Sequence, residues 1–228
     1  MIDTETIIYA LLGGILPALV WLAFWLHEDY KHPEPRGLIL ETFLLGMGAV
    51  VFVLPFQKAV EMVFPSMAFF ALLLWVVLEE VFKLGAAYAG GLRSIEDNEP
   101  IDPIIYMITA ALGFVALENA LFIIGPLIGE DIMRGVITGN LRFIGASLLH
   151  VVSSGFVGVS LAFSFYQPMS KRVTYVILAL VLAIIFHTSF NLAIVHWENL
   201  GAMIAFALVW ISVVFLLLAF ERAKTIAR

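Results

Sequence analysis

The sequence predicts an all-α fold: a polytopic membrane helix bundle of about seven transmembrane helices. Of its 228 residues, 62% are hydrophobic and only 13% are charged, and the mean hydropathy is +1.04, whereas soluble domains are about 45–50% apolar and about 25% charged. Apolar runs of about 20 residues, the length that crosses a bilayer, recur along the whole chain. Polar connectors containing Pro and charged residues separate these runs.

Seven apolar runs follow one another in the sequence. The first has no cationic start and no small-residue cleavage site, so we expect a retained helix and not a signal peptide. Asp102-Pro103 predicts the start of the fourth helix, with Asp102 as the N-cap residue and Pro103 at the first helical position. The seven runs cover residues 5–26, 38–56, 66–90, 103–128, 141–166, 173–195 and 200–220.

The distribution of Lys and Arg predicts the orientation of the chain. Eight lie in alternate connectors and at the C-terminus, three lie on the opposite side, and Lys83 lies within a run. Since cytoplasmic loops are enriched in basic residues, we expect the N-terminus outside and the C-terminus in the cytoplasm. The eight are Lys31, Arg36, Arg93, Lys171, Arg172, Arg222, Lys224 and Arg228, and the three are Lys58, Arg134 and Arg142.

Composition also excludes several classes of function. The chain has no cysteine, so disulfides, thiolate metal sites and cysteine nucleophiles are absent. Its net charge is −6, and neither a basic patch nor an acidic block indicates a nucleic-acid partner. We expect the lipid bilayer to surround the protein.

Two adjacent glutamates interrupt the third run. Glu79 and Glu80 lie near its middle, where insertion of one charged residue costs about 2.5–3.5 kcal/mol. Lys83 follows them by four and three residues, so its ammonium can reach either carboxylate on a helix. A self-neutralising packing cluster is the alternative interpretation. However, one Lys offsets only one acid, so the other must be protonated, paired elsewhere or facing water, which indicates a functional site.

Three later runs also carry polar residues at depth. We expect Ser154 and Gly158 to serve close helix packing. The remaining charged and imidazole side chains are few enough that we expect them to share one cavity, nearer the outer than the inner face. They are Glu79, Glu80, Lys83, Glu118, His150 and His187, joined by Asn119 beside Glu118 and by Asn191, which shares a helix face with His187.

These residue types suit hydrolysis of a peptide bond. That reaction needs an activated water, a stabilised oxyanion and a proton for the leaving amine. A poorly solvated glutamate is a competent base or acid, and His or Asn can donate to an oxyanion. Carboxylate and imidazole groups could equally bind zinc. The pattern H-E-x-x-H is absent, and both mechanisms stay open.

The motif Glu79-Glu80-x-x-Lys83 resembles the EExxK signature of PrsW-type intramembrane proteases. Further motifs at the intervals of that family bring the resemblance to residues 79–191, about half of the chain. Glu99 stands where an Asp is usual, and Phe122 where a Tyr is common. The further matches are Pro100-x-Asp102-x-x-x-Tyr106, Gly113-Phe114, Glu118-Asn119, His150 and His187 in Phe186-His187-Thr188-Ser189-Phe190-Asn191.

The resemblance implies a single integral-membrane protease domain over 1–228, with its motif-bearing core at about 66–195. It implies cleavage of a single-span membrane protein, of the anti-sigma-factor type, near the outer face of a prokaryotic plasma membrane. The implied catalytic residues are Glu79, Glu80, Glu118, His150, His187 and Asn191, supported by Lys83 and Asn119. If the enzyme needs a metal such as zinc, the implied ligands are Glu80, Glu118, His150 and His187; otherwise no cofactor is expected.

Three alternatives remain at this stage. His187-x-x-x-Asn191 after a double-glutamate helix is similar, more faintly, to CAAX-type prenyl endopeptidases, which are described as glutamate-dependent and metal-free. Buried acids and histidines also build proton- or ion-coupled transporters, although the repeated halves and broken helices of many transporters are not visible. A non-catalytic membrane scaffold or sensor is the third alternative.

Overall fold

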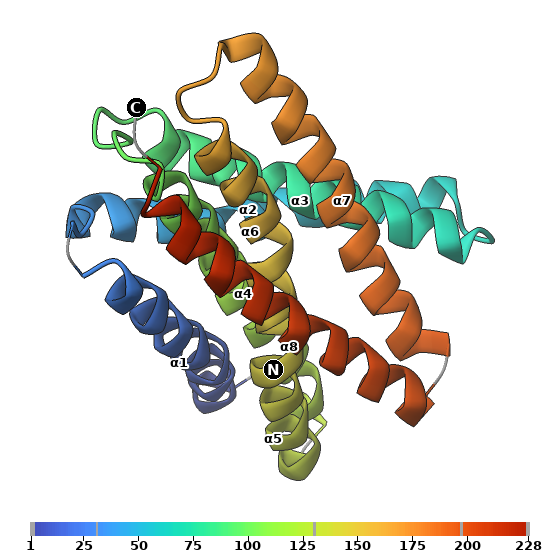
Figure 1. Cartoon of the computed structure of the whole chain (residues 1–228). Coiled ribbons are helices and arrows are strands. Elements are labelled where there is room, and N and C mark those ends of the chain that lie inside the picture. The colour runs from blue at the N-terminus through green and yellow to red at the C-terminus, as the bar shows by residue number, and fades with distance from the viewer. Residues whose placement is uncertain (1–2, 31, 130, 197, 227–228) are drawn as a thin grey trace.

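The computed structural model describes residues 3–30, 32–129, 131–196 and 198–226. Within these ranges the chain is helical and contains no β-strand (Figure 1). The helices are α1 (Thr4–Glu28), α2 (Arg36–Val63), α3 (Ala68–Ala87), η1 (Tyr88–Leu92), α4 (Asp102–Ile128), α5 (Ile132–Leu141), η2 (Arg142–Ala146), α6 (Ser147–Phe163), α7 (Met169–His196) and α8 (Glu198–Ala223), where η1 and η2 are π-helical turns.

The predicted fold class is confirmed. Among the described residues, six helical segments are long and apolar enough to cross a membrane, and one of them is the continuous stretch Ile132–Phe163 formed by α5, η2 and α6. Helix α3 has 20 residues, which is also enough to span, but it carries Glu79, Glu80 and Lys83. These charges set α3 apart from the other six.

Two local predictions were wrong. The fifth helical segment begins at Ile132 rather than near residue 141, because the Asp131 carboxylate accepts a hydrogen bond from the Arg134 N–H (2.9 Å) and caps a further helix there. Asp102 does not cap α4. Its carboxylate instead accepts from the N–H groups of Asn98 (2.8 Å) and Glu99 (2.7 Å), which closes the turn before the helix.

Helix α4 is the centre of the bundle. Most of its residues are buried on every side, and α1, α2, α3 and α6 surround it. Small residues allow the neighbouring backbones to approach closely. A Cβ at Gly46 of α2 would lie 2.2 Å from the Ala110 carbonyl oxygen, and one at Gly113 of α4 would lie 2.0 Å from that of Phe43. Gly158 likewise packs α6 against Ile104, as expected for a close-packing position.

Two glycines of α2 provide a matched test of this packing. Gly46→Ala should destabilise the protein by about 1–3 kcal/mol, because α2 and α4 must separate to admit the methyl group. Gly48→Ala, with no atom within 4 Å of the added Cβ, should be neutral or stabilising by up to about 1 kcal/mol through helix propensity. Thermal unfolding in detergent measures both. Equal effects of the two substitutions would contradict the close approach.

The connectors gather at two ends of the bundle. Figure 1 shows the α1–α2, α3–α4 and α6–α7 connectors and the C-terminal end together at the upper left of the view. The connectors that the basic residues assign to the other side lie away from that end. Lys31 and Arg228, which count toward the predicted cytoplasmic side, lie outside the described residues.

Carboxyl groups lie close together at the end of the bundle that holds the α1–α2 and α3–α4 connectors. Asp29 follows α1 and is 5% exposed, and its Oδ2 atom is buried without a hydrogen-bond partner among the described residues. Glu34, before α2, accepts a hydrogen bond from the Tyr106 hydroxyl of α4. Burial, and then the charge of Asp102, raise the pKa of Asp29 to about 7 and that of Glu34 to about 9.

This cluster should make stability depend on pH. Both carboxyls hold protons in the folded protein at pH values where the unfolded chain has ionised them, so folding is favoured at the lower pH. The Tm should therefore fall between about pH 5 and about pH 9 as these protons are lost. The double variant Asp29→Asn/Glu34→Gln should show a flatter profile. An unchanged slope in that variant would exclude these two groups as its source.

Candidate active site

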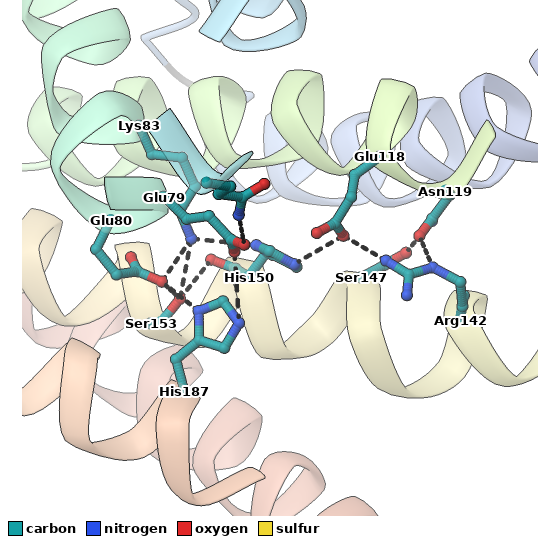
Figure 2. A network of polar contacts seen from close by, with 11 residues as sticks. Glu79, Glu80, Lys83, Glu118, Asn119, Arg142, Ser147, His150, Ser153 and His187 are labelled. Carbon is teal, nitrogen blue, oxygen red and sulfur yellow. Dashed lines mark hydrogen bonds and ion pairs between the residues drawn. The ribbon is translucent and has the colours of Figure 1, made fainter. Parts of the chain in front are cut away.

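A cavity of about 460 Å³ opens among α3 to α8. It brings together side chains from distant parts of the chain, most of them apolar. The polar members include Glu79, Glu118, Arg142, His150, His187 and Asn191, and the aromatic members are Trp75, Phe122, Phe190 and Phe206. Figure 2 shows these polar groups, apart from Asn191, as parts of one connected network. Of the residues expected to share one cavity, five line it: Glu79, Glu118, His150, His187 and Asn191. Glu80, Lys83 and Asn119 do not line it and are joined to it only through the polar network.

The two glutamates of α3 have different surroundings. Glu80 is 1% exposed, and its Oε1 atom accepts from the Lys83 ammonium (2.6 Å) and from the Ser153 hydroxyl of α6 (3.0 Å). Glu79 instead accepts from the Gln57 amide of α2 (2.9 Å). Thus Lys83 pairs with one acid, although its helical position permits either.

His187 of α7 lies between the two glutamates. Its Nδ1 atom is 2.6 Å from Glu80 Oε1, and its Nε2 atom is 3.7 Å from Glu79 Oε2. A carboxylate that pairs with Lys83 can only accept here, so Nδ1 carries the proton. The Nε2 atom of the ring faces Glu79. A carboxylate on the second ring nitrogen is the usual way to orient a metal-binding histidine.

His150 of α6 connects two parts of the network. Its ring centroid is 4.9 Å from that of His187. Its Nδ1 atom is 3.1 Å from the Lys83 ammonium, and its Nε2 atom is 3.2 Å from Glu118 Oε2. A metal ion bound by His150 would replace one of these two contacts.

Glu118 of α4 is also paired with a cation. Arg142, the first residue of η2, donates from Nη2 to Glu118 and from Nε to Asn119 Oδ1 (2.5 Å). Asn119 in turn donates to the Ser147 hydroxyl (3.2 Å). The Phe143 carbonyl of η2 accepts a hydrogen bond from the indole N–H of Trp21 (3.1 Å), which ties η2 to α1.

The donor set fits a metal ion. Ligand atoms of Glu79, His150 and His187 lie within 4.8 Å of one another, and all three residues are buried. The Glu79 Oε2 atom is buried without a hydrogen-bond partner among the described residues, and a cation would satisfy it. Two imidazoles and a carboxylate are also a usual ligand set for catalytic zinc. Of the four predicted ligands, His150 and His187 belong to this three-residue group, whereas Glu80 and Glu118 lie outside it. Glu79 was not among the predicted ligands.

The sequence missed four residues of the network. Gln57 and Ser153 are neutral residues on apolar helices, and no sequence signal marks them. Arg142 was counted only among the basic residues of the outer side, because the fifth run was expected to begin at residue 141 and Arg142 would then stand at its outer end. The stripe of small and polar residues on α6 could have indicated Ser147. Asn191 lines the cavity near His187, as its helical spacing predicts.

Together the fold and the site define a polytopic membrane protein with a buried glutamate–histidine centre of the kind that hydrolases use. A family model described as "PrsW family intramembrane metalloprotease" matches residues 34–219. The chain belongs to the PrsW family and is therefore an intramembrane protease. This confirms the resemblance carried by the EExxK motif.

Curated relatives support the same assignment. The chain is 27% identical over 212 residues to Protease PrsW of Halalkalibacterium halodurans, covering 89% of this chain and 93% of that protein. It is 28% identical over 206 residues to Protease PrsW of Geobacillus kaustophilus, covering 87% and 86%. It is 25% identical over 190 residues to Protease PrsW of Bacillus subtilis, covering 82% and 83%. No solved structure matches the chain.

Proposed function

We propose that this protein is a zinc-dependent endopeptidase that cleaves a single-span membrane protein, of the anti-sigma-factor type, near the outer membrane face. One observation carries the proposal: Glu79, His150 and His187, from three helices, meet at a cavity inside the bundle with ligand atoms within 4.8 Å. A zinc ion at this group would supply a water that ionises near neutral pH.

The surrounding side chains have separate roles in this proposal. Glu80 fixes the His187 ring through Nδ1, and Lys83 compensates the charge of Glu80. Glu118, 3.2 Å from His150, accepts the proton of the attacking water and returns it to the leaving amine. Asn191, on the cavity wall beside His187, donates a hydrogen bond to the oxyanion.

The position of the cavity favours cleavage towards one face of the membrane. Its lining includes Thr138 of α5, Ile194 of α7 and Ala202 of α8. These residues lie towards the α4–α5 and α7–α8 connectors, the side that the basic residues assign to the exterior. A substrate entering from the outer leaflet would reach the glutamates without crossing the whole bundle.

The function can be tested in liposomes. Purified protein should cleave a single-span substrate that carries a different fluorophore at each end, and it should not change the ion permeability of the same vesicles. Ion flux without cleavage would favour the transporter alternative. Cleavage of a prenylated C-terminal peptide alone would favour the CAAX-type alternative.

Introduced cysteines test the proposed orientation, because the native chain has none. Cysteines at Glu61 and Gly129 should react with an impermeant maleimide from outside intact cells. Cysteines at Ser94 and Ser170 should react only after permeabilisation. The reverse labelling pattern would overturn both the orientation and the proposed outer-face cleavage.

A further inference from the structure

Arg142 is an arginine that the proposed hydrolysis does not use, although its side chain lines the cavity. It is 16% exposed, like its partner Glu118. An arginine presents five N–H donors in a rigid plane. Hydrogen bonds within the protein come from Nε and Nη2, and none from Nη1 is found among the described residues. Donors therefore remain available beside the cavity.

The guanidinium group is held in one orientation. Glu118 and Asn119 accept its hydrogen bonds, and the Phe122 ring centroid is 3.9 Å from its central carbon. Figure 2 shows Arg142 and Asn119 beside Ser147, with Glu118 between Arg142 and His150. Such fixation lowers the entropy lost when a further ligand binds. A side chain that served only as a counter-ion to Glu118 would not need to be held in one orientation.

The chemistry of the cavity indicates which ligand would use the remaining donors. The charge of Arg142 is already matched by Glu118, so a second carboxylate is not required. The rest of the wall is mainly apolar. A substrate helix must unwind to expose its peptide bond, and its main-chain carbonyls then lose their hydrogen bonds in a medium with little water. A neutral carbonyl acceptor fits the available donors.

Resting on the proposed function, we propose that Arg142 binds a main-chain carbonyl of the unwound substrate next to the scissile bond. Because Glu118 separates Arg142 from His150, this carbonyl belongs to a residue flanking the cleaved bond and not to the bond itself. Arg142 thereby holds the segment in register over the glutamates.

Steady-state cleavage of peptide substrates by purified protein tests the assignment. Arg142→Gln should raise KM about 10–100-fold, the effect of losing a hydrogen bond from a charged donor, with a smaller change in kcat. Arg142→Lys should not restore KM, because it keeps a charge beside Glu118 but loses the planar fork. Arg134→Gln, on the exposed surface of α5, is the control and should match the wild type.

A substrate series identifies the carbonyl. Each flanking amide is replaced in turn by an alkene isostere, which removes the acceptor and keeps the shape. The wild type should lose affinity at one position, whereas Arg142→Gln should be indifferent there. If Arg142→Lys restores KM, or if both proteins respond alike to the series, Arg142 acts only through Glu118 and this inference is wrong. A wild type that cleaves none of the substrates would instead remove the proposed function, and this inference with it.

Discussion

Glu79→Gln should lower the cleavage rate by about 10²–10⁴-fold, a loss as large as that of a general base, because an amide would bind the water-activating zinc more weakly than the carboxylate would, while the protein stays folded. Glutamine keeps the size of the side chain and can still pair with Gln57, which now contacts Glu79 at 2.9 Å. A neutral amide also costs less to bury than a carboxylate. Initial rates in detergent, together with thermal unfolding, measure the two effects separately.

Glu80→Gln should behave differently and is the natural comparison. The substitution leaves the fully buried Lys83 ammonium without its counter-charge, which costs about 3–5 kcal/mol in comparable buried pairs. The Tm should therefore fall together with activity. Glu61→Gln, on the exposed end of α2, serves as the control. If Glu79→Gln were the destabilising change and Glu80→Gln the silent one, the roles assigned to the two acids would be reversed.

The sequence predicted the helices well because the length and apolar character of a span are local properties. The sequence-based prediction was wrong where contacts between helices determine the local structure. Asp131 begins a helix in a stretch that contains Gly135, Gly139 and Asn140, residues that favour turns when nothing packs against them. In the structure this helix lies close against α4: a Cβ added at Gly135 would lie 3.0 Å from the Leu127 side chain, and one at Gly139 would lie 3.4 Å from that of Ile123. We infer that this packing keeps the segment helical.

The sequence could predict which residues form the site, but not which of them form hydrogen bonds or ion pairs with one another. Helical spacing puts Lys83 within reach of both acids, and only Ser153 and His150 on α6 draw it towards Glu80. The same spacing gives no information on Gln57, which approaches Glu79 from another helix. A charged residue in the middle of an apolar run is recognisable in a sequence because its insertion into a membrane costs free energy. Neutral hydrogen-bond partners such as Ser153 give no comparable signal.

Removal of bound metal should abolish cleavage, and zinc should restore it. The ligand atoms of Glu79, His150 and His187 are close enough to share one ion, and a protein that has lost it would keep its helices but not its activated water. The measurement is activity before and after dialysis against a chelator. Metal content by mass spectrometry provides a second readout that does not depend on turnover.

Single substitutions then distinguish the residues that bind zinc from the residues that orient them or act beside them. His187→Ala should lose most of the bound zinc. Glu80→Gln should bind zinc about 10–100-fold more weakly, because the group that orients His187 through Nδ1 no longer carries a charge. Glu118→Gln should keep the metal and lose turnover, since Glu118 lies outside the three-residue group. A protein that contains no metal and cleaves at full rate in the chelator would contradict the zinc mechanism, and Glu79 would then have to activate water alone.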